Sequence, residues 1–565
     1  MKTNIEQKQL LFIVFLTQCF SLIFEQIFVK NLNLLVSDFL LSQSLSLSIY
    51  MLTVGIGALL GEKIKDEKLI MRMLFFQILL AIMYSTALPI TWFIHSFVKI
   101  TSLNILAPPV LAVEPVRLTI MKFSLPIIGL VGLLTGLELS AFLKIANNLK
   151  GEKSVNLVVF CSYLGGFTGT LFFAIFLPYL NMQLLLNVIS FLVLFMSAYL
   201  YFKIFSYTRL DLKKASLILG TTVLIIVLFS YESDLTKFHL QSRYLQGVNI
   251  RINSLADLST LSSFYKNNLP EQNDVIRIQT QYQFADFVTR PNIGTTLYLN
   301  GEPQLDPRWN VSYHEALAHI PIQLAGQVPK KILVLGAGDG LLINELLKYS
   351  TQIQSIDLVE IDPAIINLAQ QNRFFLNLNK QSLDNKIVRI HILDALQFLR
   401  NSQDSYDAIY ADFPLPFDYD LLKLYSFELF TLIHKHLNSN GYFSFDSAMD
   451  YAYLGLEKSI NKNKWTLILR DTLYAAGLKE QYPFFANESF MFVSKSPIQI
   501  NTALKKLGAD YQYLTSDILA NSIISFKNKV PDFYSTFPKS ENELSPANIN
   551  SIFSPKLNYL KSGEL

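Results

Sequence analysis

The sequence has little charge and almost no cysteine. Charged residues make up 16% of the 565 residues and hydrophobic residues 51%, whereas a typical soluble protein has about 25% charged residues. Part of the chain is therefore expected to lie outside water. The net charge is only +3, and no dense Lys/Arg stripe with interleaved aromatics occurs, so a nucleic-acid partner is not supported. Cys19 and Cys161 both lie in apolar segments, which excludes a disulfide framework, a zinc site and a thiol nucleophile.

Long hydrophobic runs fill the first part of the chain. Seven stretches are close to the roughly 20 residues that a helix needs to cross a bilayer, namely 9–29, 39–61, 70–97, 123–143, 155–179, 183–204 and 214–231. They predict an all-α multi-span membrane domain over residues 1–235. The first stretch is too long for a signal peptide and lacks a small-residue cleavage site. In the fifth stretch Gly165, Gly166 and Gly169 favour close helix packing.

Two acidic residues, Glu25 and Glu138, lie within these apolar stretches. Because a carboxylate in lipid is costly, such residues are functional candidates. The alternative is that each lies near the end of a span, or is protonated and bonded to a neighbouring helix.

The composition changes after residue 235. Residues 236–328 alternate like the strands of a hairpin sheet and predict a β-rich subdomain. Residues 329–500 alternate strand and helix, from "KKILVLGAG" to "GYFSFDS", which predicts a Rossmann-like, doubly wound parallel α/β sheet. Residues 501–565 are a mixed, polar extension.

A glycine-rich turn and three acidic residues stand at successive strand ends. The turn "VLGAGDG" contains Gly336 and Gly338, and glycine lets a backbone approach a ligand closely. Glu360, about 20 residues later, is placed to accept hydrogen bonds from ribose hydroxyls. Asp394, at the end of the third strand, is within reach of an adenine amino group. These residues predict an adenosine-containing ligand.

Two further aspartates indicate which adenosine-containing ligand is bound and how it reacts. Asp339 in the turn would repel a pyrophosphate but not a sulfonium, which favours S-adenosylmethionine or a relative over NAD. Asp412 ends the fourth strand, in "YDAIYAD", beside the reactive end of such a ligand. A carboxylate there can hold a cationic amine, take its proton and direct its lone pair at the carbon next to the sulfonium. The alternative interpretation of Asp412 is a helix N-cap or a loop residue.

The segments "YLNGEPQ", "YHEALAHIPI", "VLGAGDG", "LVEIDP", "DAL" and "YDAIYAD", in this order, resemble the spermidine synthase (polyamine aminopropyltransferase) family. The resemblance covers roughly residues 275–500, and the whole chain looks like the variant with an N-terminal multi-span membrane domain. It implies transfer of the aminopropyl group of decarboxylated S-adenosylmethionine to putrescine or another amine, with release of methylthioadenosine.

The resemblance also implies roles for individual residues. Asp412 would be the catalytic acid–base residue, and no metal is implied. The nucleoside would be bound by Gln283, Gly336, Gly338, Glu360, Asp394 and Ala395, and the amines by Tyr313, His314 and Asp339. Besides the small amine, the expected partner is the lipid bilayer, and a homo-oligomer is compatible with the sequence.

Two departures from the family pattern affect the amine. Most members have a second acidic residue three positions after the catalytic one, where this chain has Leu415. Asp418 or Asp420 could replace it if the loop folds back. The family also has Asp-Glu before the "YHE" block, where this chain has Trp309 and Asn310. The acceptor could therefore be another amine than putrescine.

Two other functions remain open at this point. One is an S-adenosylmethionine-dependent methyltransferase, which would have to accommodate the carboxylate of its donor. The other is a membrane transporter or sensor whose synthase-like domain only binds.

The sidedness of the chain follows from its loop charges. Lysines and arginines gather before the first apolar stretch and after the second, fourth and sixth, which predicts a cytoplasmic N-terminus. Seven spans would then leave the catalytic part outside the cytoplasm. The donor nucleoside is made in the cytosol, so we expect a cell (inner) membrane protein with a cytoplasmic catalytic part, against the loop charges. Three alternatives remain open: one stretch does not cross, an eighth crossing lies at 104–113, or the catalytic part lies outside the cytoplasm.

Overall fold

The computed structural model describes residues 6–36, 39–65, 69–102, 113–176, 180–204, 212–244, 274–291, 293–414, 416, 419–447, 462–486, 488–499, 504–505, 507, 509–529 and 531–556. The chain forms two compact units, Met1–Asn292 and Ile293–Leu565, and each is described by itself.

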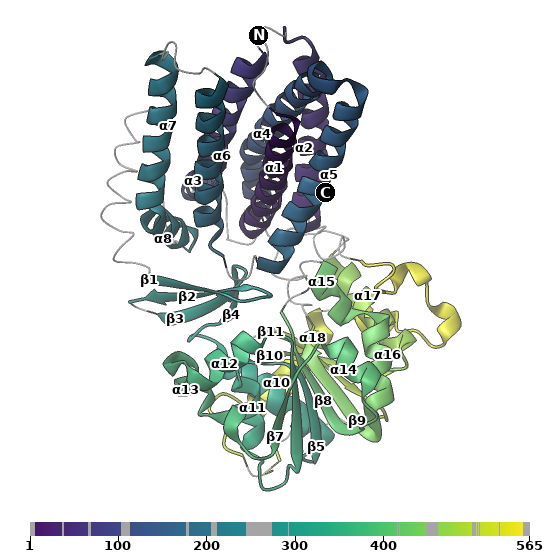
Figure 1. Cartoon of the computed structure of the whole chain (residues 1–565). Helices are drawn as coiled ribbons and strands as arrows, with labels where there is room; N and C mark the ends of the chain where they lie inside the picture. Colours follow the sequence, from purple (N-terminus) through teal and green to yellow (C-terminus); the bar gives the residue numbers. More distant parts are fainter. Residues whose placement is uncertain are drawn as a thin grey trace. The chain divides into compact units, whose positions relative to one another are not determined.

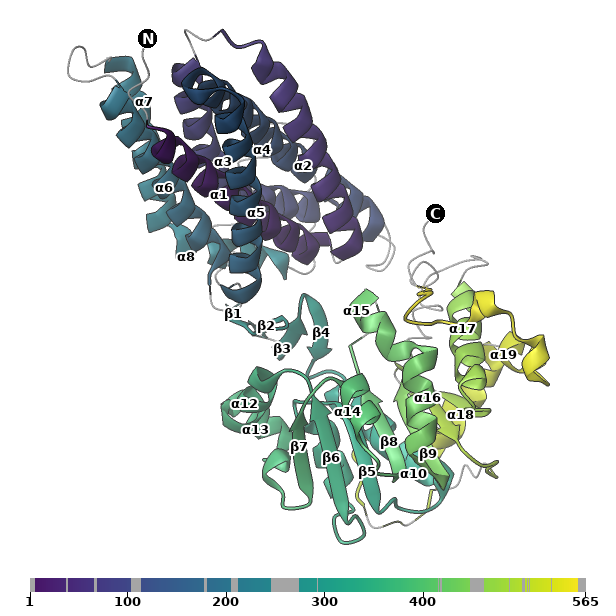
Figure 2. The ribbon, with the colours of Figure 1, turned by 45° about the vertical axis from the view of Figure 1, so that its right-hand side comes forward.

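Helices fill the first unit (Figures 1 and 2). They are α1 (Gln7–Val36), α2 (Phe39–Glu62), α3 (Leu69–Ser102), α4 (Val113–Lys150), α5 (Glu152–Phe176), α6 (Met182–Ile204), α7 (Leu212–Ser230) and α8 (Glu232–Arg243). Each of the seven predicted apolar stretches overlaps one of α1–α7, and the fifth and seventh extend past the ends of α5 and α7. Among the described residues, six helices are long and apolar enough to cross a membrane. The number rises to seven if the bent pair of α7 and α8, at 57°, counts as one span. The proposed eighth stretch lies outside the described residues except for Val113.

Small residues let α1 and α5 approach closely. A Cβ atom added to Gly165 would lie 2.3 Å from the carbonyl oxygen of Phe15, and one added to Gly169 would lie 2.4 Å from that of Cys19. Only glycine leaves room for that backbone. The predicted close packing is confirmed for these two residues, whereas Gly166 meets Leu22 at an ordinary distance of 3.6 Å.

The first unit also contains the antiparallel hairpin of β1 (Asp274–Gln279) and β2 (Phe284–Arg290). Its Asp286 is buried and accepts hydrogen bonds from the Arg277 guanidinium at 2.6 Å and from the Tyr244 hydroxyl at 2.6 Å. The hairpin is thereby tied to the residue that follows α8. The Lys30 ammonium, in the last third of α1, lies 5.3 Å from the centre of the Phe284 ring. The hairpin therefore lies at the end of the unit opposite the N-terminus.

The second unit begins with a hairpin and a buried helix. Strands β3 (Gly294–Leu299) and β4 (Glu302–Leu305) pair antiparallel, and α10 (Asn310–Ala325) follows. The end of the stretch expected to be β-rich is therefore helical, because the "YHEALAH" segment buries nearly all of its residues as a helix rather than alternating in and out.

A seven-stranded sheet forms the centre of this unit, in the order β10-β11-β9-β8-β5-β6-β7. The strands are β5 (Lys331–Gly336), β6 (Ser355–Glu360), β7 (Val388–Ile392), β8 (Tyr406–Asp412), β9 (Leu437–Asp446), β10 (Glu480–Ala486) and β11 (Glu488–Ser494). The connecting and flanking helices are α11 (Leu341–Leu347), α12 (Pro363–Gln371), α13 (Arg373–Asn379), α14 (Ala395–Asn401), α15 (Tyr419–Leu422), α16 (Phe427–His436), α17 (Lys462–Ala475), α18 (Ser516–Lys529) and α19 (Pro531–Ser535).

The prediction of a parallel sheet is only partly correct. Strands β5 to β9 are parallel, but β11 runs antiparallel to both β9 and β10. The single residue between β10 and β11 permits only a hairpin, since a parallel pair needs a crossover connection. Strand order reverses between β5 and β8, and ligands of such sheets bind beyond the carboxyl ends of the strands at this point.

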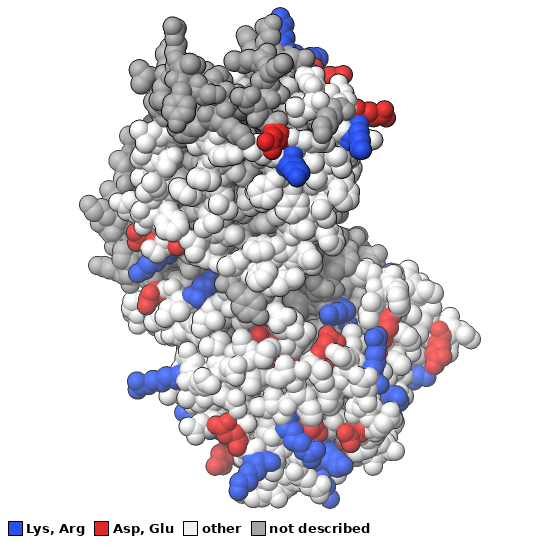
Figure 3. Space-filling model, viewed as in Figure 1, with Lys and Arg blue, Asp and Glu red and all other residues white. Residues whose placement is uncertain are grey.

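Charged side chains distribute differently over the two units. In the view of Figure 3, those of the first unit lie toward its ends and leave an uncharged band, whereas those of the second unit are scattered over its surface. The uncharged band agrees with the apolar composition of α1–α6.

Candidate active site

The turn after β5 touches two of the predicted acidic residues. Gly336 (φ 79°) and Gly340 (φ 80°) adopt left-handed backbone conformations, which glycine adopts without strain. A Cβ atom on Gly336 would lie 2.4 Å from the backbone oxygen of Asp412, and one on Gly338 would lie 2.7 Å from Glu360 Oε2. The glycines thus let the turn contact the ends of both neighbouring strands.

Strand register brings the acidic residues to one edge of the sheet. Gly336 pairs with Asp412, Leu335 pairs with Val359 next to Glu360, and Glu360 pairs with Ile392. The carboxyl ends of β8, β5, β6 and β7 therefore lie side by side. Asp394 follows two residues after the end of β7.

Asp412 lies between groups from α10 and from the glycine turn. The Tyr313 hydroxyl donates to its Oδ1 at 2.8 Å, and His314 Nε2 lies 3.9 Å from its Oδ2. Burial raises the pKa of Asp412 to about 6, with His314 opposing the increase and Asp339 adding to it. Asp412 therefore titrates about one pH unit below neutrality in a partly enclosed position, with one carboxylate oxygen bonded to Tyr313.

The position of the His314 ring is set by its own helix. Its Nδ1 lies 2.7 Å from the carbonyl oxygen of Asn310, and because a carbonyl only accepts, Nδ1 carries a proton. This bond turns the opposite nitrogen, Nε2, toward Asp412.

Glu360 and Asp339 are also perturbed. Burial raises the pKa of Glu360 to about 7, against the backbone N–H of Asp362, which donates to its Oε1 at 2.8 Å. Burial likewise raises the pKa of Asp339, whose Oδ1 accepts the backbone N–H of Leu341 at 2.8 Å. The charge of Asp339 contributes to the raised pKa values of both Glu360 and Asp412. The three carboxylates therefore lie close together in one site.

The structure brings Tyr313, His314, Asp339, Glu360 and Asp412 together, as the sequence led us to expect. Other predicted residues have different surroundings. Asp394 caps α14 by accepting the Gln397 N–H at 3.1 Å, and it lies 3.7 Å from Lys423 Nζ. Ala395 is the first residue of that helix. Gln283 belongs to the first unit, in the turn between β1 and β2. Leu415 and Asp418, and the side chain of Asp420, lie outside the described residues.

Two acidic residues that the sequence did not single out lie near the same edge. Ala411 pairs with Phe445, so Asp446 at the end of β9 lies next to Asp412. Glu488 begins β11 two residues before Phe490, the partner of Asp446. Both acidic residues, after burial and Asp412, raise the pKa of the Tyr313 hydroxyl. Asp446 could have been recognised as another strand-end acid, but nothing local in the sequence marks Glu488.

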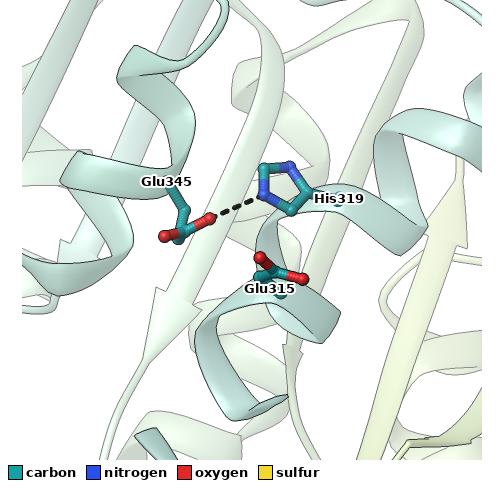
Figure 4. A group of neighbouring side chains, drawn as sticks. All are labelled: Glu315, His319 and Glu345. Atoms are coloured by element: carbon teal, nitrogen blue, oxygen red, sulfur yellow. Dashed lines mark hydrogen bonds and ion pairs between the residues drawn. The ribbon is translucent and has the colours of Figure 1, made fainter. Parts of the chain in front are cut away.

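Glu315, His319 and Glu345 form a cluster whose geometry could hold a metal ion (Figure 4). Their atoms already have partners. Glu315 accepts the backbone N–H groups of Gln512, Tyr513 and Leu514 at 2.7, 2.8 and 3.0 Å. His319 Nε2 lies 2.8 Å from Glu345, which also binds the Lys348 ammonium at 2.5 Å. An ammonium in this position suits an internal ion network, and the network fixes the C-terminal segment to α10.

Comparison with known proteins gives one family. Residues 310–464 match the family described as "Spermine/spermidine synthase domain". A polyamine aminopropyltransferase of Oceanobacillus iheyensis is 26% identical over 503 residues, which is 88% of each chain. One of Leptospira interrogans is 28% identical, over 68% of this chain and 72% of that protein. Polyamine aminopropyltransferase 2 of Bacillus cereus is 37% identical over 31% of this chain and 46% of that protein. The resemblance stated from the sequence is confirmed.

Two solved structures are also similar. Spermidine synthase from Thermotoga maritima has a TM-score of 0.38 and 22% identity, covering 46% of this chain and 87% of that one. A spermidine synthase in complex with the transition-state analogue AdoDATO has a TM-score of 0.37 and 21% identity, with the same coverage.

The raised pKa of Glu360 predicts that this residue lowers the stability of the folded protein at high pH but not at low pH. Below the ordinary glutamate pKa both folded and unfolded states are protonated. Between that value and about 7 only the unfolded state ionises, so stability is lost as pH rises. Glu360→Gln should therefore stabilise the ligand-free protein at pH 8, by of the order of 2 kcal/mol, and by much less at pH 4.5. Thermal unfolding of the purified protein at both pH values measures this difference.

Asp407, at the other end of β8, is the matched control. Burial raises its pKa, but backbone N–H groups of Lys330 and Lys331 and the amide of Asn438 outweigh this and lower it overall. Asp407→Asn should destabilise the protein at pH 8, and its effect should shrink as the pH falls toward the folded-state pKa. Equal shifts for Glu360→Gln at both pH values would contradict the assigned burial.

Proposed function

We propose, from the spermine/spermidine synthase domain that this chain contains, that the protein is a polyamine aminopropyltransferase. It transfers the aminopropyl group of decarboxylated S-adenosylmethionine to putrescine or another amine and releases methylthioadenosine. The observation that carries the proposal is the meeting of Asp339, Glu360 and Asp412 at one sheet edge.

The side chains suit the two ends of the donor. Glu360, in contact with the glycine turn at Gly338, is proposed to accept hydrogen bonds from the ribose hydroxyls. Asp394 and Ala395 at the start of α14 are proposed to face the adenine. Asp339 adds negative charge where a cationic aminopropyl arm, rather than a donor carboxylate, is favourable.

Asp412 is proposed as the acid–base residue. With its pKa near 6 it is largely ionised at neutral pH and can take a proton from the acceptor ammonium. The freed nitrogen lone pair attacks the methylene next to sulfur, the carbon–sulfur bond breaks, and its electron pair neutralises the sulfonium. The Tyr313 hydroxyl bond to Oδ1 leaves Oδ2 for the amine.

Removing the Asp412 charge should abolish most of the transfer. Asp412→Asn should lower kcat roughly 10²–10⁴-fold, while methylthioadenosine still binds. In the parent protein kcat/KM should rise between pH 5 and 7 with a midpoint near 6. Release of methylthioadenosine from the decarboxylated donor measures both effects.

The Asp407→Asn variant, at the opposite end of the same strand, should keep its activity. Formation of S-adenosylhomocysteine from S-adenosylmethionine, with no methylthioadenosine from any amine, would contradict the proposal in favour of methyl transfer.

Asp446 and Glu488 are proposed to bind the distal ammonium of the acceptor. Leu415 stands where the family places a second acidic residue, so the amine pocket needs negative charge from elsewhere. Asp446 lies beside Asp412 by strand register, and Glu488 begins β11, the strand that pairs with β9. The charges of both residues raise the pKa of the Tyr313 hydroxyl. Tyr313 also bonds Asp412, and its ring lies tilted against that of Phe490 at 5.3 Å.

Neutralising Asp446 should weaken binding of the acceptor amine but not binding of the nucleoside. A charge-assisted hydrogen bond is worth about 1.5–3 kcal/mol, so Asp446→Asn should raise the KM for the amine roughly 10- to 100-fold. Asp446→Glu should restore much of the loss. Steady-state kinetics with a panel of diamines, together with methylthioadenosine binding, separates this effect from misfolding. An unchanged KM for the amine would contradict the proposal that Asp446 binds the distal ammonium.

The proposed organisation is a membrane-spanning domain at 1–235, a β-rich subdomain at 236–328, a catalytic domain at 329–500 and an extension at 501–565. Helix α8 packs on the last part of α3, where the Trp92 and His239 rings stack at 4.9 Å and Ser96 bonds Ser242 at 2.5 Å. Since α3 points away from the N-terminal end of the unit, α7 spans the bundle. We propose seven crossings in the cell membrane, with the catalytic unit in the cytoplasm, where its donor is made.

Seven crossings place the two ends of the chain on opposite sides. A fluorescent protein fused to the C-terminus should fluoresce, because it folds in the cytoplasm, and a phosphatase fused there should be inactive. A phosphatase fused through an export-compatible linker before Gln7 should be active. Active phosphatase at the C-terminus would contradict this orientation, and matching readouts at both ends would contradict the odd number of crossings.

A further inference from the structure

A buried polar seam crosses the middle of the helical unit. Ser21 of α1 bonds the Tyr50 hydroxyl of α2 at 2.5 Å and the Thr135 hydroxyl of α4 at 3.0 Å. Tyr84 of α3 is buried within the same cluster of hydroxyl groups. Four helices thus supply hydroxyl groups to one point among otherwise apolar residues.

A glutamate lies on each side of these hydroxyls. On α1, Glu25 follows Ser21 by one turn, and on α4, Glu138 follows Thr135 by three residues. The two helices run in opposite directions, because the late residues of α1 pack with the early residues of α4 and the reverse. Helical rise therefore separates the two carboxylates by about 10 Å along the bundle.

Neither carboxylate has a cationic partner among the described residues. Both side chains are 1% exposed. Glu25 accepts the Gln26 amide at 2.6 Å, and Glu138 accepts the Gln77 amide at 2.8 Å, which in turn accepts from Ser197 at 2.9 Å. Lys30, later on α1, lies over Phe284 instead. An uncompensated buried charge is unfavourable, so a bound cation would stabilise both groups.

An unpartnered amide on the same helix face is a second, independent sign of an absent ligand. Gln18 is 7% exposed, and its Nε2 has no hydrogen-bond partner. It precedes Ser21 by three residues and Glu25 by seven, so it shares their face of α1. Because α1 and α4 are antiparallel, Gln18 lies at the level of Glu138. Buried polar atoms are normally paired, and a ligand lying along this face would reach the amide.

The geometry points to a second amine site inside the helical unit, in which Glu25 and Glu138 bind the two terminal ammonium groups of a linear polyamine. The hydroxyls of Ser21, Tyr50 and Thr135 line its middle. The separation of the carboxylates corresponds to an extended triamine rather than to a short diamine or a single metal ion. A triamine is the expected product when the proposed reaction uses a diamine, so this inference rests on the proposed function only for the source of its ligand.

Binding stoichiometry tests the site in the full-length protein, in detergent or lipid nanodiscs. Equilibrium dialysis with labelled spermidine should give two sites per chain in the parent, one of them in the catalytic unit. Glu138→Gln and Glu25→Gln should each weaken the second site by at least about tenfold and leave aminopropyl transfer unchanged. Glu152→Gln, in the exposed first turn of α5, is the matched control and should retain both sites.

A ladder of α,ω-diamines tests the spacing without any mutation. Competition at the second site should strengthen with chain length up to the length of spermidine and should be weakest for putrescine. A single site in the parent, or two sites that survive both glutamine variants, would overturn the inference and leave protonated glutamates as the explanation. Absent aminopropyl transfer with two intact sites would instead contradict the proposed enzyme and spare the second site.

Discussion

The catalytic unit depends on the absence of side chains at two positions in the turn after β5. Gly336 and Gly338 leave no room for a Cβ atom, because the backbone of Asp412 and the carboxylate of Glu360 already occupy that space. The turn can therefore lie against the ends of β8 and β6 at once. Parallel register then brings acidic residues from separate strands to one edge. Burial, with a smaller contribution from their mutual repulsion, raises the pKa values of Glu360 and Asp412 to about 7 and about 6.

Local pattern predicted the parts of this arrangement that depend on neighbouring residues in the chain. Alternating strand and helix, the glycine turn, and Glu360 and Asp412 as strand-end acids can all be read within short windows. Long-range pairing is different. The antiparallel pairing of β10 and β11 can be inferred only once the ends of both strands are known, because the single residue between them then allows only a hairpin. Glu488 joins the site only because Phe490 pairs with Asp446. Asp394 was predicted from its strand end alone, and its capping bond to Gln397 depends on where α14 begins.

Both units contain buried acidic side chains whose charge suits a cationic ligand. In the catalytic unit, we propose that such acids receive a sulfonium and an ammonium. In the helical unit, Glu25 and Glu138 are buried among apolar side chains with only amide partners. A buried carboxylate without a cationic partner is unfavourable among apolar side chains. The position of the two glutamates in the middle of the bundle, with amide partners alone among the described residues, is therefore the reason for inferring a cationic ligand there.

The loop charges and the proposed reaction give opposite answers about which side of the membrane the catalytic unit faces. The basic residues gather at the end of the bundle that holds the N-terminus, whereas the β1–β2 hairpin lies at the opposite end of the same unit, where Lys30 lies over Phe284. The charge rule would place the catalytic unit outside the cytoplasm. That rule describes a bias during insertion, to which each residue contributes modestly. The need for a donor nucleoside is absolute, since an aminopropyltransferase without its donor has no function. We therefore give the chemistry more weight in proposing that the catalytic unit faces the cytoplasm.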